Sequence, residues 1–192
     1  MAGHDTGAAR SRLVLIGPMG AGKTTIGKRV ARALNADFID SDAEFVRLHG
    51  PIASYFEAQG EAAFRREERS VVESALRRSA VLSLGGGAVL DPATRVDLAA
   101  VPVVLLTATA DAVRERLGSG TRPLVRGGIA DWTRIMEQRR PVYEALADIV
   151  IDTSRRPITL IAAEITEWML AQRPSASSSD QAASGCPSGR QS

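Results

Sequence analysis

Short apolar runs alternate along the chain with longer stretches in which apolar and polar residues recur at helical spacing. The apolar runs are residues 13–16, 38–39, 81–84, 103–106 and 149–151. Runs of this kind fit strands that are buried on both faces, which is typical of a parallel sheet covered by helices. The pattern therefore predicts an α/β fold of three layers, in which helices flank a parallel five-stranded sheet.

Helical spacing fills the segments between these runs. We expect helices over about residues 23–34, 41–49, 51–59 and 61–78. A further helix is expected to begin after Asp91, because aspartate caps a helix N-terminus and Pro92 suits the first helical position.

The two ends of the chain differ in composition from its middle. Residues 174–192 are rich in serine, glycine and proline, and residues 1–10 are similarly polar. Such segments bury too little apolar surface to offset their conformational entropy. We therefore expect one folded domain over residues 11–173, a disordered leader over residues 1–10 and a disordered tail over residues 174–192.

Composition and charge restrict the class of protein. The net charge of only +2 argues against binding nucleic acid or a membrane through a basic surface. No apolar run approaches the ~20 residues of a membrane span, and the single cysteine, Cys186, makes no internal disulfide. We expect a reduced, cytoplasmic setting. We also expect a monomer, because no apolar stripe in the sequence suggests an obligate oligomer.

A phosphate-binding motif follows the first apolar run. Residues 17–24, GPMGAGKT, match G-x-x-x-x-G-K-[ST] in full and open a predicted helix. Glycines let successive backbone N–H groups cradle phosphates, and the positive end of the helix dipole adds to the attraction. The side chain of Lys23 would reach the β- and γ-phosphates, and the hydroxyl of Thr24 would bind Mg²⁺. The expected phosphate-binding residues are Gly20, Ala21, Gly22, Lys23, Thr24 and Thr25.

The nucleotide is expected to be ATP. The guanine-specifying pattern Asn-Lys-x-Asp does not occur, since neither Lys23 nor Lys28 follows an asparagine. This absence argues against a GTPase.

Two carboxylates follow the second apolar run. Residues two apart on an extended segment point the same way, so Asp40 and Asp42 are expected to face the magnesium site together. The alternative is that Ser41 or Asp42 only caps the helix that follows. Gly85–Gly87, after the third run, suits either close approach of the backbone to a ligand or a plain turn.

Several motifs together resemble the shikimate kinases, in the order in which that family has them. They are the phosphate loop, Asp40-x-Asp42, residues 64–68 (FRREE), residues 84–87 (LGGG), residues 121–124 (TRPL) and Arg139-x-Pro141-x-Tyr143. The similarity extends over about residues 13–170. It implies a P-loop kinase fold with a mobile lid and ATP-dependent phosphorylation of the 3-hydroxyl of shikimate, a step toward chorismate and the aromatic amino acids.

The resemblance also implies roles for residues at the acceptor end of the site. Asp42 would accept a hydrogen bond from the attacking hydroxyl, while Asp40 would lie in the outer shell of the magnesium ion. Arg65 and Arg139 would bind the carboxylate of shikimate through their guanidinium forks, with Glu68 holding Arg65. The backbone of Gly86 and Gly87 would contact the substrate. Arg66 and Arg69, in contrast, are expected to pair at the surface with adjacent glutamates.

The resemblance implies a lid and an adenine site as well. The glycine-rich residues 118–130 would form the lid, whose Arg122 would neutralise charge on the transferred phosphoryl group; the alternative is an ordinary surface loop. Arg156 and Pro157 would lie against adenine. The arginine on the opposite side is left open, since Glu115 occupies the family's usual position and Arg114 and Arg116 flank it.

Two other functions remain as alternatives. One is a related small-molecule kinase such as a gluconate kinase, because gluconate is also a polyol carboxylate. The other is a P-loop nucleotide-binding regulatory protein without a small-molecule acceptor. Dependence of ATP turnover on an added hydroxy acid separates these possibilities.

Overall fold

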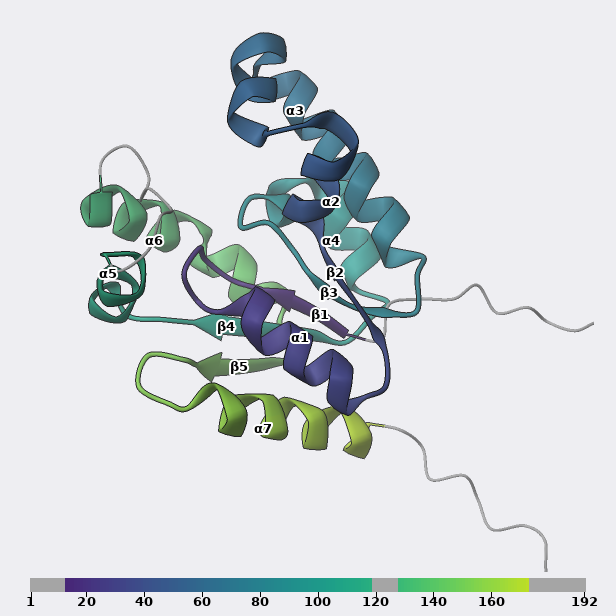
Figure 1. Ribbon diagram of the computed structural model, residues 1–192, viewed down its shortest axis with the longest axis vertical. Coiled ribbons are helices and arrows are strands. Elements are labelled where there is room, and N and C mark those ends of the chain that lie inside the picture. The colour runs from purple at the N-terminus through teal and green to yellow at the C-terminus, as the bar shows by residue number, and fades with distance from the viewer. Residues whose placement is uncertain (1–12, 119–127, 173–192) are drawn as a thin grey trace, which may run out of the picture.

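The computed structural model describes residues 13–118 and 128–172 (Figure 1). A parallel sheet of five strands forms the centre, in the order β2-β3-β1-β4-β5, which confirms the predicted sheet. The strands are β1 (Leu13–Ile16), β2 (Asp37–Asp40), β3 (Ala80–Ser83), β4 (Val103–Thr107) and β5 (Ile149–Asp152). The predicted leader and tail, and most of the predicted lid, lie outside the described residues.

The topology places the chemistry at one edge of the sheet. All strands run in the same direction, so their carboxyl ends meet at that edge. The central strand β1 lies between β3 and β4, and the strand order reverses beside it. In open α/β sheets, ligands bind at such a reversal, outside the carboxyl ends of the strands.

One face of the sheet is covered by α1 (Lys23–Ala33) and α7 (Ile158–Ala171). Leu13 and Leu15 of β1 point toward this face, where they share a buried apolar cluster with Ile26 and Val30 of α1 and Ile161 of α7. The alternate residues of β1 point the other way, as strand geometry requires. The strands are therefore buried on both sides, which accounts for their apolar composition.

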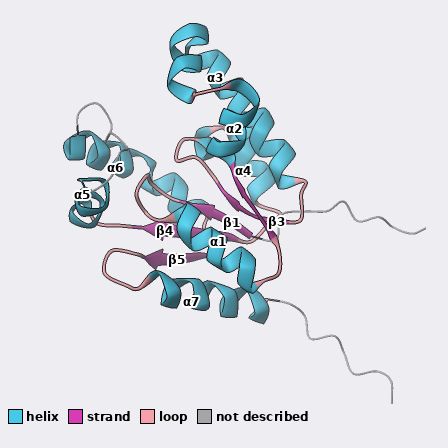
Figure 2. Ribbon diagram, in the orientation of Figure 1, coloured by secondary structure: helices cyan, strands magenta, loops and turns pink. Residues whose placement is uncertain are grey.

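The opposite face is covered by α3 (Ile52–Leu76), α4 (Pro92–Leu98), α5 (Ala110–Gly118) and α6 (Gly128–Leu146). Val14 and Ile16 pack there with Val72 of α3 and with Met136 and Tyr143 of α6. Figure 2 shows the strands between the two helical layers, so the predicted three-layer architecture is confirmed.

The helix α2 (Ser41–His49) and the first part of α3 extend away from the sheet (Figure 1). A smaller apolar cluster of Phe45, Phe64 and Val71 joins the two helices. Within α3 the chain leaves helical geometry at Gly60, where φ is +79°. This break separates the two helices that the sequence predicts over residues 51–59 and 61–78.

Two further local predictions are confirmed. The α4 helix starts at Pro92, and the carboxylate of Asp91 caps it by accepting a hydrogen bond from the backbone N–H of Thr94 at 2.9 Å. A short 3-10 turn, η1 (Ala88–Leu90), precedes this cap and was not predicted. Among the described residues, no helix combines the length and the apolar character needed to cross a membrane.

Candidate active site

The phosphate loop occupies the turn between β1 and α1, where its sequence predicts it. Gly17 has a φ of +133°, and a Cβ at this position would lie 2.1 Å from the carbonyl oxygen of Leu106 on the neighbouring strand β4. Gly20 and Gly22 also have positive φ values, of +82° and +89°. These glycines therefore serve the loop's own geometry, because other residues rarely adopt that conformation.

The side chain of Lys23 bends back over the loop. Its ammonium donates hydrogen bonds to the carbonyl oxygens of Gly17 at 2.7 Å and Pro18 at 2.9 Å. Burial lowers the pKa of Lys23 to about 8, although the carboxylates of Asp42 and Asp40 oppose that shift. The ammonium thus lies in a site that favours an approaching anion.

Asp40 connects the phosphate loop to α2. One carboxylate oxygen accepts a hydrogen bond from the hydroxyl of Thr24 at 2.7 Å. The other accepts hydrogen bonds from the backbone N–H groups of Asp42 at 3.2 Å and Ala43 at 3.3 Å. Asp40 is therefore the N-cap of α2, and the alternative that Ser41 or Asp42 caps this helix is wrong.

Asp42 lies in the first turn of α2 rather than on an extended segment. The spacing argument for Asp40 and Asp42 was therefore wrong in its geometry, yet both side chains line the same cleft. No group of three or more histidine, cysteine, aspartate or glutamate side chains within the described ranges forms a candidate metal site. Thr24 and Asp40 together present a hydroxyl and a carboxylate, which are oxygen ligands of the kind that Mg²⁺ prefers.

The residues Gly85–Gly87 lie against functional side chains. A Cβ at Gly85 would lie 2.3 Å from a carboxylate oxygen of Asp42, and one at Gly87 would lie 2.6 Å from a guanidinium nitrogen of Arg65. The backbone N–H of Gly85 donates to the hydroxyl of the buried Ser41 at 2.8 Å. The glycines therefore leave room for the side chains of Asp42 and Arg65, while the expected close approach to a ligand stays a prediction.

Arg139 and Tyr143 of α6 reach the same loop. The hydroxyl of Tyr143 donates to the carbonyl oxygen of Gly86 at 2.6 Å, and burial raises the pKa of this hydroxyl. Arg139 lines the cleft, whereas the neighbouring Arg140 pairs with Glu137 on the exposed side of α6. The position of Arg139 is thus compatible with the role that the resemblance implies for it, whereas Arg140 points away from the cleft.

One cleft, with a volume of about 1390 Å³, connects most of these groups. The expected site residues that line it are Gly20, Ala21, Gly22, Lys23, Thr24, Thr25, Asp40, Asp42, Gly86 and Arg139. Arg65 and Gly87 line an adjoining cavity of about 350 Å³ instead. There Arg65 forms an ion pair with Glu68 at 2.6 Å, the contact that the family resemblance implies. Arg122 lies outside the described residues.

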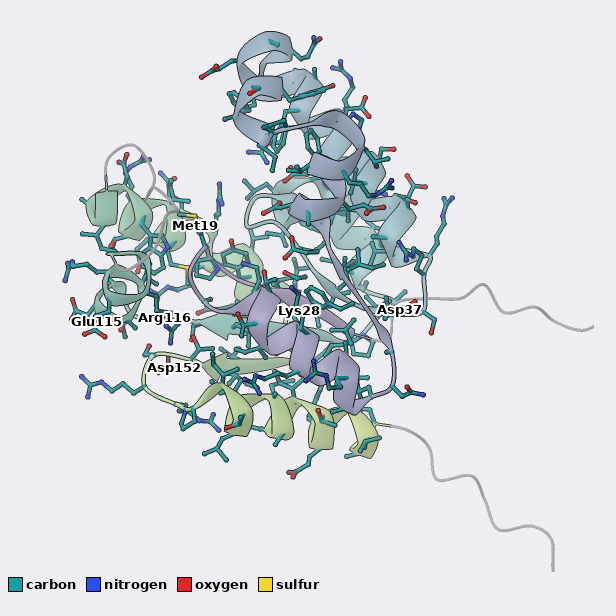
Figure 3. All side chains as sticks on the ribbon, in the orientation of Figure 1. Met19, Lys28, Asp37, Glu115, Arg116 and Asp152 are labelled. Carbon is teal, nitrogen blue, oxygen red and sulfur yellow. The ribbon has the colours of Figure 1, made fainter. Side chains whose placement is uncertain are left out.

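At the other end of the cleft, Arg116 joins the phosphate loop to the loop after β5. Its guanidinium donates to the carbonyl oxygen of Gly20 at 3.0 Å and to the hydroxyl of Thr153 at 3.1 Å. Figure 3 shows Arg116 between α5 and the loop that begins at Asp152. Arg114 pairs with Asp111 on the exposed side of α5, and Arg156 pairs with Glu164 of α7.

Two further residues, which the sequence did not indicate, form hydrogen bonds to the phosphate loop. The buried hydroxyl of Thr153 contacts the carbonyl oxygens of Ala21 at 3.0 Å and Thr107 at 2.9 Å. The indole N–H of Trp132 on α6 donates to the carbonyl oxygen of Met19 at 2.9 Å. Trp132 belongs to no recognisable motif, and Thr153 lies just before the predicted adenine residues Arg156 and Pro157 without a predicted role of its own. Each reaches the phosphate loop from a distant part of the chain.

Comparisons with known proteins agree with this geometry. The family model for shikimate kinase matches residues 19–170. The shikimate kinase of Corynebacterium efficiens is 41% identical over 161 residues, which are 82% of this chain and 95% of the relative. The structure of a shikimate kinase from Acinetobacter baumannii in complex with shikimate has a TM-score of 0.77 and 33% identity, covering 84% of this chain and 93% of that one.

A gluconokinase from Sinorhizobium meliloti shares the fold at lower similarity. Its TM-score is 0.61 and its identity is 21%, with 85% of this chain and 93% of that chain covered. The gluconokinase therefore supports the architecture alone, whereas the family model and the relatives above support a more specific assignment. This chain belongs to the shikimate kinase family.

Proposed function

We propose that this enzyme transfers the γ-phosphoryl group of ATP to the 3-hydroxyl of shikimate in the cleft described above. The observation that carries the proposal is the shared space between the phosphate loop and the acceptor residues. Lys23 and Thr24 line the cleft together with Asp42 and Arg139. A donor and an acceptor held in one cleft gain the advantage of proximity and orientation.

At the acceptor end, Asp42 receives the hydrogen bond of the attacking hydroxyl and Arg139 binds the carboxylate of shikimate. Arg65 joins Arg139 in this task, although it lines the adjoining cavity. Support comes from the glycine loop, because Arg65 lies against Gly87 and Arg139 lies against the neighbouring Gly86. Two guanidinium groups that lie against neighbouring glycines of one loop are well placed to bind a planar carboxylate.

At the nucleotide end, the phosphates bind to the backbone of Gly20–Gly22 and to Lys23, Thr24 and Thr25. Lys23 turns from the carbonyl oxygens of its own loop to the phosphates. We propose Arg116 rather than Arg114 as the arginine beside adenine, because Arg116 contacts the loop after β5. Arg156 and Pro157 complete the adenine site when Arg156 leaves Glu164.

The family uses ATP with a divalent metal ion, and we propose Mg²⁺ here. The hydroxyl of Thr24 and the carboxylate of Asp40 fit such an ion, with Asp40 acting through a water molecule in the outer shell. When bound with ATP, Mg²⁺ neutralises negative charge on the transferred phosphoryl group. The task of the protein is then to orient the nucleotide, and Lys23 does so from the first turn of α1.

The remaining parts of the proposal concern the lid, the extent of the domain and the setting of the enzyme. Residues 119–127, most of the predicted lid, lie outside the described residues, whereas residues 128–130 belong to α6. Arg122 in the lid over residues 118–130 neutralises charge on the phosphoryl group during transfer. The proposed folded domain spans residues 11–173, and the predicted leader over residues 1–10 and tail over residues 174–192 lie outside the described residues. We propose that the enzyme works in the cytoplasm, since its composition gives no sign of a nucleic acid or membrane partner, and as a monomer, since no apolar stripe in the sequence suggests an obligate oligomer.

The release of ADP from Mg-ATP tests the proposal directly. We expect turnover with shikimate and only background hydrolysis without an acceptor or with gluconate at the same concentration. Turnover with gluconate alone would overturn the acceptor assignments at Asp42 and Arg139. Hydrolysis that ignores both acids would favour a regulatory nucleotide-binding protein instead.

A further inference from the structure

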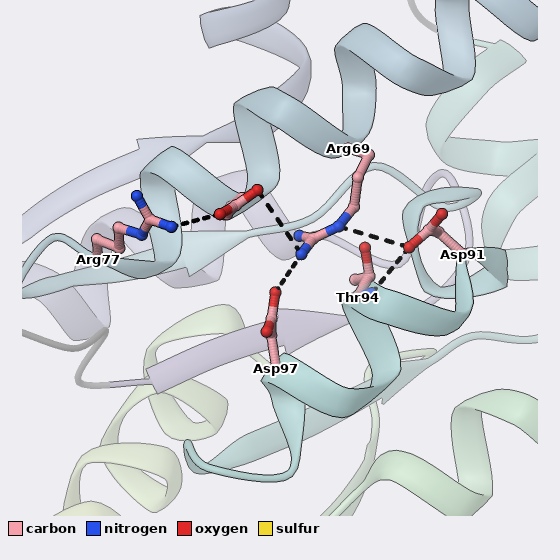
Figure 4. Close-up of polar contacts among 6 residues, drawn as sticks. Arg69, Arg77, Asp91, Thr94 and Asp97 are labelled. Carbon is pink, nitrogen blue, oxygen red and sulfur yellow. Dashed lines mark hydrogen bonds and ion pairs between the residues drawn. The ribbon is translucent and has the colours of Figure 1, made fainter.

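Arg69 makes contacts that its sequence position did not predict. Its side chain is only 19% exposed, and its guanidinium pairs with Asp97 at 2.5 Å and Asp91 at 3.5 Å, both in or beside α4 (Figure 4). The contact with Glu73, one turn along α3, is longer at 3.9 Å. The expectation of surface pairing with adjacent glutamates is therefore wrong for Arg69, because its main partners belong to another helix.

The two aspartates lie at opposite ends of α4. Asp91 caps the N-terminus of this seven-residue helix, and Asp97 lies in its last turn. Arg95, between them, donates to the carbonyl oxygens of Val89 and Leu90 at 2.8 Å each, which ties η1 to α4. The segment 88–98 thus forms one unit that continues directly from Gly87. Through its two ion pairs, Arg69 of α3 connects both ends of α4 to α3.

Arg69 and Arg65 share one face of α3, because residues four apart lie one above the other on a helix. Both line the cavity of about 350 Å³, together with Glu68, Gly87, Asp91 and Thr94. Gly87 lies so close to the guanidinium of Arg65 that a Cβ there would be 2.6 Å away. The separation of α3 from the segment 88–98 therefore decides how Arg65 lies on the glycine loop.

Burying Arg69 between α3 and α4 costs free energy, because not all of the buried polar atoms there are hydrogen-bonded within the described part of the chain. One guanidinium nitrogen of Arg69 and the hydroxyl of Thr94 are buried with no hydrogen-bond partner among the described residues. Buried polar atoms are usually paired, and a buried charge pair is weak evidence for stability on its own. A role in fixing geometry accounts better for a charge kept in this place.

We propose that Arg69 is a positioning residue for the acceptor: by attaching α4 to α3, it fixes Arg65 against Gly87 in the orientation that binds the carboxylate of shikimate. This inference rests on the proposed function, in which Arg65 and Gly87 contact the substrate. Arg69 itself touches neither substrate nor the reacting atoms.

The test compares Arg69→Met with Arg77→Met. Arg77 is the matched control, because it is the C-cap residue directly after α3 and also pairs with Glu73, but its side chain is 74% exposed and the pair makes no contact with α4. For Arg69→Met we expect the KM for shikimate to rise roughly tenfold while the KM for ATP stays within about twofold, the signature of lost acceptor binding. For Arg77→Met we expect both KM values to stay within about twofold of the wild type.

Asp97→Asn serves as a second variant in case Arg69→Met does not fold. Asp97 is 38% exposed, and its replacement leaves the guanidinium of Arg69 with the carboxylates of Asp91 and Glu73 as partners. We expect a smaller rise in the KM for shikimate, in the same direction. The double variant Arg69→Met/Asp97→Asn is expected to be no worse than Arg69→Met, because both changes remove one connection.

A melting temperature that falls while the KM for shikimate is unchanged would reduce Arg69 to a structural brace and overturn the inference. An equal rise of both KM values would overturn it too. If Arg69→Met does not fold, an unchanged KM for shikimate in Asp97→Asn decides against it. A wild-type enzyme without shikimate-dependent ADP release would refute the proposed function, and the positioning role with it.

Discussion

At the scale of single residues, this site depends on contacts that leave no room for an extra atom. Gly17 shows the strongest case, since a Cβ would lie 2.1 Å from a backbone oxygen of β4. A backbone atom in the middle of the sheet cannot move aside as a flexible side chain does. The position is therefore closed to every residue except glycine for two reasons, its space and its φ of +133°.

Gly17→Ala is expected to destabilise the fold much more than Gly50→Ala. Both glycines have positive φ values, but nothing lies within 4 Å of a Cβ at Gly50. Backbone strain alone costs about 1–3 kcal/mol, which is the loss we expect for Gly50→Ala. The clash should add at least about 2 kcal/mol for Gly17→Ala, on the scale of overpacking in a rigid core. Chemical denaturation measures both free energies of unfolding, and equal losses would contradict the clash.

The pKa of Lys23 predicts that ATP binding takes up protons. A pKa of about 8 means that about half of the Lys23 side chains are neutral at pH 8 in the free enzyme. Bound phosphates favour the charged ammonium and so raise this pKa. ATP affinity should therefore fall as the pH rises from 7 to 9. Calorimetry at pH 8 in buffers of different ionisation enthalpy should show uptake of roughly half a proton.

Lys23→Met supplies the control for this measurement. Without the titrating ammonium, the dependence on the buffer is expected to disappear, and the remaining affinity should lose most of its fall between pH 7 and 9. Equal heats for the wild type in every buffer at pH 8 would mean that Lys23 is already fully protonated in the free enzyme.

At the scale of secondary-structure elements, the loop after β5 supports the phosphate loop from the side. Thr153 is buried, and its hydroxyl contacts a carbonyl oxygen of each neighbour, Ala21 and Thr107, while accepting a hydrogen bond from Arg116. One hydroxyl in the loop after β5 thus contacts the phosphate loop, β4 and α5 at the nucleotide end of the cleft. A side chain of the same shape without the hydroxyl would keep the packing and lose the connection.

Thr153→Val is expected to raise the KM for ATP roughly three- to tenfold, because a lost hydrogen bond and a stranded buried carbonyl cost about 1 kcal/mol or slightly more. The KM for shikimate should change less than twofold, since Thr153 is at the other end of the site. Thr166→Val is the matched control, because within the described part of the chain that hydroxyl donates only to the carbonyl oxygen of Ala162 on its own helix. Equal effects of the two changes on ATP would argue against Thr153 as a support.

The residues at the nucleotide end of the cleft show which parts of the site can be predicted from the sequence and which cannot. Lys23, Thr24 and the strand-to-helix turn belong to one short segment, so a local pattern contains the whole signal. Thr153 and Arg116 reach Gly20 and Ala21 from positions about a hundred or more residues away along the chain. Their roles follow from the strand order, and a lone threonine after a strand gives no sign of them. The expectation for Arg69 was wrong for the same reason, because its two nearest partners, Asp97 and Asp91, lie beyond its own helix.

At the scale of the whole molecule, α6 connects the two ends of the cleft. Trp132, near its start, donates a hydrogen bond to Met19 of the phosphate loop, and Tyr143, three turns later, donates to Gly86 of the acceptor loop. The helix rises 1.5 Å per residue and continues from one contact to the other, with Pro141 inside it. We therefore expect a change at either loop to reach the other through α6.

The indole of Trp132 gives this connection an optical signal. The chain has only two tryptophans, and the other, Trp168, lies in α7 on the opposite face of the sheet. ATP is expected to change the fluorescence of Trp168→Phe, in which Trp132 alone emits. The change should be absent from Trp132→Phe. A signal that survives only in Trp132→Phe would mean that the phosphate loop does not shift against α6.

The coupling itself can be measured by adding the ligands in both orders. If α6 transmits a shift, ATP should alter the affinity for shikimate, and shikimate must then alter the affinity for ATP by the same factor. Trp132→Phe keeps an aromatic ring but removes the N–H that donates to Met19, so this factor should move toward one while each ligand still binds alone. Titrations of Trp132→Phe and the wild type by calorimetry decide the matter. If the factor by which each ligand alters the affinity for the other is the same in Trp132→Phe and the wild type, the coupling arises from contacts between the two substrates and not from α6.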